Sequence, residues 1–203
     1  MNRRAILLAL AAHLLLTGCF RPYPTYRYRM TVEVDTPEGL RRGSTVIEVR
    51  SRFEDVGLNQ IITHKLTAEA AVVDLGRRGT FFALLRSDDD IDWAKLLYYK
   101  LTQFPRSPAG TNMAEDGAMA NEIITRNTGL ITLPRRFITD STDSGRSGYP
   151  TLIRFRNQLD SGSKEYIDPE NMAKTFGPGV KLRRVTVALT SDRPSNNIER
   201  LLP

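Results

Sequence analysis

The ten residues at positions 26–35, YRYRMTVEVD, alternate without a break between apolar and polar side chains. On an extended chain the apolar side chains all fall on one face: Tyr26, Tyr28, Met30, Val32 and Val34. Alternation with a period of two is typical of a strand that buries one face and exposes the other. This stretch therefore predicts a half-buried β-strand, around which the remaining chain must supply a sheet and a core.

The residues that follow predict a hairpin. Residues 36–39, Thr-Pro-Glu-Gly, have the chemistry of a turn, and Gly43 is expected to end the connection. Arg41 and Arg42 would then lie in a basic loop. A second strand is expected at 44–53. Its buried side would carry Ile47, Val49 and Phe53.

Four more stretches have the composition of strands. They are residues 64–75, 80–85, 151–157 and 181–190. Gly76-Arg77-Arg78-Gly79 predicts a turn between the first two of them. The first four expected strands, at 26–35, 44–53, 64–75 and 80–85, are expected to form an antiparallel meander.

A helix is expected from about Asp88 to Phe104. Apolar residues recur there at helical spacing, and Ser87 is placed as an N-cap with Asp90 three residues later, as in a capping box. Pro105 and Pro108 would prevent the helix from continuing.

Further helical segments are weaker or shorter. They are residues 111–127, which Gly117 interrupts, residues 168–177, which begin with Asp-Pro and end with Gly, and a last turn at 198–202. Residues 139–148 predict an exposed loop. Together the patterns predict one α+β domain at 26–203, with a mainly antiparallel sheet of about six strands and two or three helices.

The N-terminal segment predicts an export signal. Arg3 and Arg4 precede the twelve residues Ala5–Leu16, which are Ala, Ile and Leu with a single His13. At about 1.5 Å per residue, a helix of this length covers about 18 Å, whereas the hydrocarbon of a bilayer is roughly 30 Å thick. Residues 1–18 are therefore expected to form a signal peptide that is removed, and not a membrane span.

The stretch Leu16-Thr17-Gly18-Cys19 resembles the lipobox of bacterial lipoproteins. The resemblance implies that Cys19 is lipidated, becomes the new N-terminus and holds the protein on a membrane through its acyl chains. By the sorting rule of that class, Phe20 in place of Asp implies the outer membrane, facing the periplasm. Residues 19–25, with prolines at 22 and 24, are expected to form a short tether between the lipid and the domain.

Composition indicates a globular and mildly basic chain. Apolar residues make up 40% of it, and removal of residues 1–18, which carry two arginines and no acid, lowers the net charge from +6 to +4. The arginines are scattered through the predicted strands and do not form a block, so no nucleic-acid partner is expected. Attraction to anionic lipid, lipopolysaccharide or acidic glycan is the milder functional interpretation.

Few residues are available for metal or covalent chemistry. Cys19 is the only cysteine, and His64 is the only histidine after the signal peptide, so neither a disulfide nor a zinc site built on Cys and His is expected. No Gly-x-Ser-x-Gly elbow accompanies His64 to suggest a catalytic triad. The glycine-rich stretches 76–79 and 176–179 lack the Lys-Ser/Thr of a phosphate loop, and we expect no cofactor.

The densest group of acids is formed by Asp88, Asp89, Asp90 and Asp92. Such oxygens suit calcium or acid–base catalysis, but the order of ligands in an EF-hand loop is missing. Acids in the first turn of a helix are stabilised by its dipole. We therefore interpret the cluster as the start of the predicted helix, and no metal site is expected.

A second resemblance covers most of the chain after the signal peptide. Residues 149–155 (YPTLIRF), residues 168–180 and the hairpin at 26–49 are similar to a set of uncharacterised alphaproteobacterial proteins. The resemblance implies a single folded unit and implies no activity.

The sequence thus favours a non-enzymatic, lipid-anchored envelope protein. It would bind another envelope protein or an acidic glycan, or help to maintain the envelope. One alternative is a hydrolase of cell-wall glycan, peptide or ester that uses the Asp88 cluster or Glu115 and Asp116. Converging carboxylates, or His64 beside a serine and an acid, would favour this alternative. Another alternative is a toxin-inhibiting lipoprotein of the immunity type, for which a large exposed apolar patch is expected.

Overall fold

A computed structural model describes most of the chain after Cys19: residues 20–56, 59–102, 112–137, 145–157, 159–196 and 198. The predicted signal peptide, Cys19 and most of the predicted last helical turn lie outside these residues. So does most of the predicted loop at 139–148. Within the described residues the fold is α+β with mainly antiparallel sheets, which confirms the fold class expected from the sequence.

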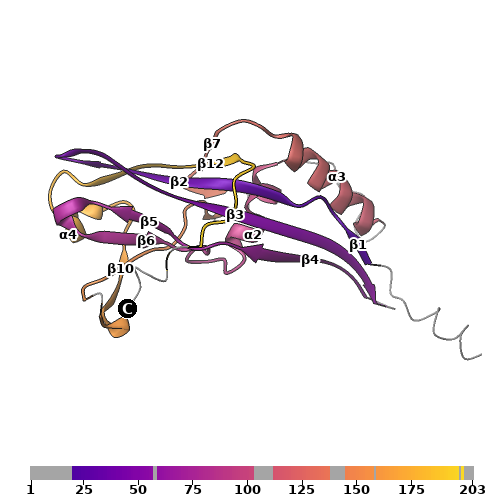
Figure 1. The fold of residues 1–203 in the computed structure, drawn as a ribbon, viewed down its shortest axis with the longest axis horizontal. Helices are drawn as coiled ribbons and strands as arrows, with labels where there is room; N and C mark the ends of the chain where they lie inside the picture. The colour runs from indigo at the N-terminus through magenta and orange to yellow at the C-terminus, as the bar shows by residue number, and fades with distance from the viewer. Residues whose placement is uncertain are drawn as a thin grey trace, which may run out of the picture.

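The larger sheet contains six strands of the described chain: β1 (Phe20–Pro22), β2 (Tyr26–Thr36), β3 (Gly39–Val56), β4 (Asn59–Thr67), β7 (Ile131–Thr132) and β12 (Lys181–Leu189). Their order is β1-β3-β2-β12-β7, and β4 pairs with the second half of β3. All of these pairs are antiparallel. Strand β3 runs along most of the length of an elongated molecule (Figure 1).

A smaller sheet lies against one face of the larger one. Its order is β11-β10-β6-β5, from strands β5 (Ala71–Asp74), β6 (Thr80–Ala83), β10 (Leu152–Phe155) and β11 (Lys164–Ile167). Two further short strands pair with each other, β8 (Arg136–Phe137) and β9 (Arg146–Ser147). Two 3₁₀ turns are present at η1 (Gly76–Arg78) and η2 (Ser161–Ser163).

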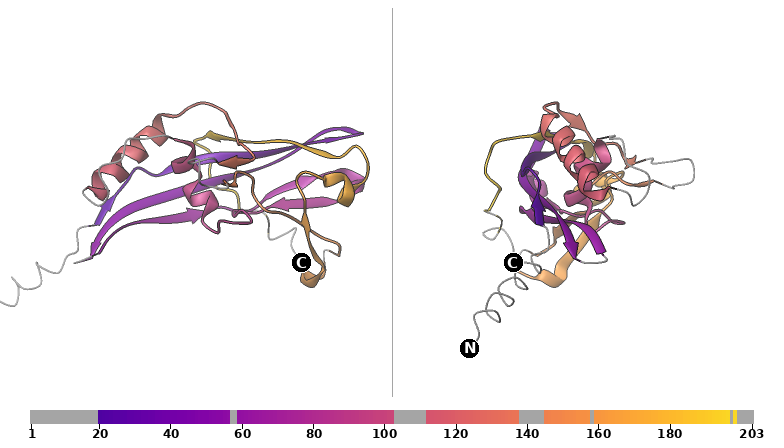
Figure 2. Two further views of the ribbon diagram at one scale, coloured as in Figure 1. Left: turned by 180° about the vertical axis from the view of Figure 1, so that it is seen from behind. Right: turned by 90° about the vertical axis from the view of Figure 1, so that its right-hand side faces the viewer.

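The α-helices of the described residues are α2 (Trp93–Leu101), α3 (Met113–Arg126) and α4 (Met172–Phe176). Figure 2 shows α3 at the same end of the molecule as β1 and the start of β4. Helix α4 lies at the opposite end, beside the turns of the β2–β3 and β5–β6 hairpins (Figure 1). No helix in this part of the chain is both long and apolar enough to span a bilayer.

The core lies between the two sheets and α2. The five apolar side chains of the 26–35 stretch are all buried, as predicted, and they pack with residues such as Phe81, Trp93 and Leu97. Tyr28 donates a hydrogen bond through Oη to the carbonyl oxygen of Ala94, at 2.7 Å. This bond satisfies a polar group in the centre of the core, where an unpaired hydroxyl would be costly.

The predicted hairpin is confirmed, but its turn is tighter than expected. Only Pro37 and Glu38 lie between the strands, and Arg41 and Arg42 are already in β3. The basic loop expected there is therefore wrong. Gly43 lies within β3, where a Cβ atom would come within 2.0 Å of the carbonyl oxygen of Val72. The glycine thus allows the backbones of the two sheets to approach, and it does not end a connection.

The single strand predicted at 64–75 is also wrong. The chain forms β4 and then β5, which belong to different sheets. The apolar pattern changes from one-sided to two-sided near residue 70 because the chain crosses there from the larger sheet to the smaller one. Five shorter strands, β1, β7, β8, β9 and β11, were not predicted, since two to four residues are too few for an alternating pattern to stand out.

Two helix starts differ from the predictions. Helix α2 begins at Trp93, not Asp88, and the hydroxyl of Ser87 donates to Asp89 Oδ1 (2.7 Å) instead of capping the helix. Helix α4 begins at Met172, because the residues from Asp168 to Asn171 form a turn. Helix α4 ends at Gly177 as predicted, where φ is +92°.

The tether predicted at 19–25 is contradicted for its described part. Residues 20–22 form β1 on the edge of the sheet, paired with Arg52–Glu54 of β3. Tyr23 is only 6% exposed, its amide donates to Ser51 O (3.0 Å), and its hydroxyl donates to Ala114 O (2.9 Å). An edge strand tolerates a proline, since one side of the strand has no partner to lose. The described fold therefore includes residues 20–25, which precede the start expected at Tyr26.

Candidate functional site

A polar pocket opens where β1, β3 and β4 meet. Its volume is about 510 Å³, which lies within the range of small-ligand sites. We call it the basic pocket. Its lining includes Pro22, Thr25, Arg50, Arg52, Thr63 and Lys65, and it is completed by Tyr23, Ser51 and His64. Three of these side chains are cationic and none is a carboxylate.

The acids nearest in sequence to these cations are already paired. Glu48 is buried and accepts from Arg27 at 2.6 Å and from Arg50 at 2.7 Å. These hydrogen bonds, first from Arg27 and then from Arg50, lower the pKa of Glu48 although burial opposes the shift. Two arginines thus share one carboxylate, which leaves an excess of positive charge beside the pocket.

The other two cations differ in their pairing. Arg52 pairs with Glu54 at 2.5 Å, and its side chain remains 58% exposed. Lys65 makes no ion pair with any residue that the structure describes. Together with the guanidinium of Arg50, which is 63% exposed, these groups give the pocket a positive and accessible rim.

Ser51 and His64 occupy opposite positions on β3 and β4, and Ser51 Oγ lies 2.8 Å from His64 Nδ1. The edge of the His64 ring meets the ring of Tyr99, with centroids 5.1 Å apart. Burial lowers the pKa of His64, and the charge of Lys95 lowers it further. The imidazole is therefore neutral at pH 7 and adds no charge to the pocket.

The Ser51–His64 pair lacks the geometry of a catalytic triad. Ser51 is only 4% exposed, and it faces Nδ1, the nitrogen that a triad uses for its acid. Among the described residues no carboxylate is hydrogen-bonded to His64. Sequence reasoning could not find this pair, because its partners are 13 residues apart and only the β3–β4 register brings them together.

The acid cluster, Asp88, Asp89 and Asp90, holds the segment before α2 in place through contacts to other parts of the chain. Asp88 accepts from Thr151 Oγ1 at 2.5 Å, and Asp89 accepts from the amide of Ser147 at 2.8 Å. Asp90 is buried and pairs with Lys100. The predicted position in the first turn of the helix is therefore wrong for these three acids. They precede α2 and connect that segment to β9, to Thr151 just before β10, and to the helix itself.

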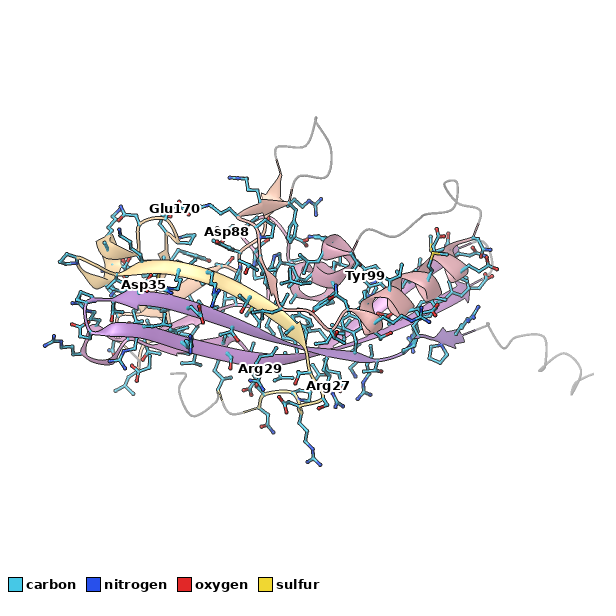
Figure 3. All side chains as sticks on the ribbon, turned by 90° about the horizontal axis from the view of Figure 1, so that it is seen from above. Arg27, Arg29, Asp35, Asp88, Tyr99 and Glu170 are labelled. Carbon is cyan, nitrogen blue, oxygen red and sulfur yellow. The ribbon has the colours of Figure 1, made fainter. Side chains whose placement is uncertain are left out.

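The cluster offers no metal site in the described residues, which contain no group of three or more His, Cys, Asp or Glu side chains placed to hold an ion. Burial alone would raise the pKa of Asp89, but hydrogen bonds from Ser147 and Ser87 lower it. Figure 3 shows Asp88 and Tyr99 at separate places along the molecule, so Asp88 lies apart from the ring that contacts His64. Glu115 and Asp116 lie on a third element, in the first turn of α3.

An apolar groove of about 560 Å³ lies near the start of α2. It is lined mainly by Leu66, Ala68, Ala70, Leu84, Leu85 and Ile91. Ile91 is 74% exposed, because α2 begins only after it. Ile198 also lines the groove, and its amide donates to Glu69 Oε2 at 2.8 Å.

The stretch 76–79 forms a turn, as predicted, and it meets the end of α4 at Phe176. Arg78 of η1 donates to Glu38 through Nε (3.0 Å) and Nη2 (3.1 Å), and to the carbonyl of Phe176 through Nη1 (2.9 Å). Arg77 also donates to Glu38. We call this group, Glu38, Arg77, Arg78 and Phe176, the distal clasp. The hydrogen bonds from Arg78 and Arg77 lower the pKa of Glu38 to about 2.

The basic pocket is the concave surface whose side chains have the most definite chemistry, a set of exposed cations with two threonine hydroxyls. Comparison with known proteins adds no further candidate site. No protein-family model, curated protein or solved structure matches the chain.

Proposed function

We propose that the protein is an outer-membrane lipoprotein whose domain lies directly against the periplasmic side of the bilayer and serves as a non-enzymatic binding or maintenance module of the envelope. The observation that carries the proposal is the position of β1. This strand begins at Phe20, one residue after the cysteine of the lipobox-like stretch, and it is paired with β3. Acyl chains on Cys19 would therefore attach to the edge of the sheet itself.

A direct attachment has a consequence for binding. Each buried methylene of an acyl chain contributes about 0.8 kcal/mol, so two or three chains hold a domain stably on a membrane. Without a flexible tether, the β1 end of the domain is kept at the bilayer surface. Partners in the periplasm then meet the faces and the end that point away from the membrane.

The test is the mass and location of the protein expressed with its own N-terminus. We expect the mature chain to begin at Cys19, to carry added acyl mass and to fractionate with the outer membrane. Cys19→Ala should leave the membrane while it keeps the same fold by circular dichroism. Phe20→Asp should move the protein to the inner membrane. A soluble, unacylated wild-type protein would refute the proposal.

The apolar groove favours a second candidate function, the docking of a protein partner as in a toxin-inhibiting lipoprotein. Its exposed Ile91 and its aliphatic lining are what such a role requires. Ile91→Asp should then abolish inhibition of the toxin without unfolding the domain, because the side chain is already in water. Unchanged inhibition would rule out this groove as the docking surface.

The Ser51–His64 contact is the specific observation in favour of the hydrolase alternative. A serine-directed fluorophosphonate probe tests it, with Ser51→Ala as the matched control. We expect no labelling that depends on Ser51, because the side chain is buried and faces the nitrogen that is unsuitable for a triad. Labelling that is lost in Ser51→Ala would instead establish a reactive serine and favour the enzyme.

A further inference from the structure

We propose that the basic pocket binds the phosphate group of a lipid headgroup in the bilayer that holds Cys19, and thereby fixes the orientation of the domain on the membrane. The proposal rests on the proposed function for its anchor. It adds a specific second contact, made by protein side chains, to the contact made by acyl chains.

The chemistry of the pocket fits a phosphate. Guanidinium groups present planar sets of donors that match phosphate oxygens, and an ammonium adds a compact charge. Arg50, Arg52 and Lys65 supply both kinds of group, and Thr25 adds a hydroxyl donor. The hydroxyl of Thr63 already donates to Glu54, at 2.8 Å. No carboxylate is among the residues that line the pocket, although Glu48 and Glu54 already accept from its two arginines.

The availability of the cations follows from their pairing. Arg50 shares the buried Glu48 with Arg27, so the three groups together retain one positive charge. Lys65 adds a second positive charge, since no described residue forms an ion pair with it. Glu54 compensates Arg52, but the side chain of Arg52 stays exposed and can donate to an incoming anion as well.

The position of the pocket selects a membrane lipid over a soluble anion. Pro22 and Thr25 line the pocket and follow Cys19 by three and six residues. At about 3.3 Å per residue, an extended chain places Pro22 within about 10 Å of Cys19. The potential of an anionic membrane surface extends about one Debye length, roughly 8 to 10 Å in physiological salt. An anchored domain therefore holds these cations where headgroup phosphates are concentrated.

The experiment measures binding without the anchor. The chain 19–203 with Cys19→Ser retains every element described above and cannot be acylated. It is mixed with vesicles of phosphatidylcholine alone or with added phosphatidylglycerol, and the bound fraction is measured by flotation at low and high salt. We expect binding only to the anionic vesicles, and we expect salt to weaken it.

Variants distinguish binding by the basic pocket from binding by the general positive charge of the protein. Each cation near an anionic surface is worth about fivefold in affinity, so Lys65→Ala should weaken binding about fivefold and Arg50→Ala with Lys65→Ala about thirtyfold. Lys174→Ala is the matched control, because Lys174 is an exposed lysine on α4 at the other end of the molecule. This variant should bind as well as the parent.

Several outcomes would overturn the inference. They are equal binding to neutral and anionic vesicles, an equal loss in Lys174→Ala, and complete displacement by inorganic phosphate, which would indicate a site for a free anion. Failure here is distinct from failure of the anchor. If acylated wild-type protein fractionates with the membrane while the Cys19→Ser chain ignores anionic vesicles, the proposed function stands and the headgroup site is refuted.

Discussion

Gly117 marks a close contact at the scale of single residues. A Cβ atom at this position would lie 2.5 Å from Tyr23 Oη and 2.7 Å from Ile62 Cδ1. Tyr23 cannot move away cheaply, because its ring is buried and its hydroxyl is bonded to Ala114. The glycine that weakens the helical pattern in the sequence is thus the residue that lets α3 pack onto Tyr23 and β4.

We predict that Gly117→Ala destabilises the protein by about 1–3 kcal/mol, the usual cost of overpacking. Alanine is better than glycine in a helix by about 1 kcal/mol, so a net loss requires the steric cost to exceed that gain. Gly129→Ala is the control, since its nearest neighbour would be 3.7 Å away. Urea unfolding of both variants checks the prediction, and a Gly117→Ala variant more stable than the wild type would contradict it.

Glu38 predicts a dependence of stability on pH. Its pKa is lowered from an ordinary value of 4.5 to about 2 by the hydrogen bonds from Arg78 and Arg77. A group whose pKa is lower in the folded state stabilises the fold above its ordinary pKa, and this contribution disappears as the pH falls through the folded value. The clasp should therefore weaken between about pH 4.5 and pH 2.

The comparison of wild type with Glu38→Gln isolates this carboxylate from the other acids of the protein. We expect the wild type to have the higher melting temperature at neutral pH and the difference to vanish as the pH approaches 2. Melting temperatures measured across this range check the prediction. Parallel curves for the two proteins would show that the ionised carboxylate contributes nothing.

Residue-level roles were predictable only where local pattern decides them. The buried face of 26–35 and the glycine at the end of α4 follow from periodicity and backbone geometry. The partners of Asp88 and Asp89 are Thr151 and Ser147, about sixty residues later, and no local rule indicates them. The basic pocket could not be predicted either. In the sequence its cations are ordinary outward-facing strand residues, and only the placement of β1 and β4 beside β3 brings them together.

At the scale of elements, β1 is the strand that the sequence pattern did not predict. Pro22 in β1 and Pro24 just after it indicate an irregular segment, but an edge strand with one free side accommodates Pro22. Helix α2 shows the opposite case, in which a plausible capping box was overridden because its acids make tertiary contacts. In both places, contacts distant in sequence outweighed the local preference.

The packing of Tyr23, which directly follows β1, predicts a large effect of Tyr23→Ala. The change removes a buried aromatic ring and the hydrogen bond to Ala114, so we expect a loss of about 3–5 kcal/mol in the free energy of unfolding. Pro24→Ala, at an exposed neighbouring position, should cost much less. Denaturant unfolding measures both. Equally small effects would mean that residues 20–25 are a tether after all.

At the scale of the whole molecule, the two ends differ in their surroundings. The end with β1, α3 and the start of β4 is the end nearest to Cys19, the proposed anchor. The end with α4 and the distal clasp is the opposite one (Figures 1 and 2). The sequence predicted the fold class and the central hairpin, because these depend on patterns within the chain. It could not predict that β4 and β5 part into two sheets, since that depends on packing.

This polarity predicts different depths for two labels on the acylated protein. Cys19 is the only natural cysteine and would be blocked by lipid, so a new cysteine can be labelled specifically. In vesicles that contain lipid-bound quenchers, a fluorophore at Gln60→Cys should be quenched, and one at Lys174→Cys should not. Gln60 lies beside Asp55 near the β1 end of β3. Equal quenching at both positions would show that the molecule lies flat.

The pairing of β1 and β2 with β3 also determines how the protein would respond to a mechanical load. The shortest chain path from Phe20 to the turn at Pro37 is already almost entirely extended strand, so a pull between these points gains very little length. The interstrand hydrogen bonds lie across the direction of such a pull and are loaded in shear, so they share the force and must break together. A domain built in this way would act as a stiff spacer, transmitting tension from one end to the other without unravelling.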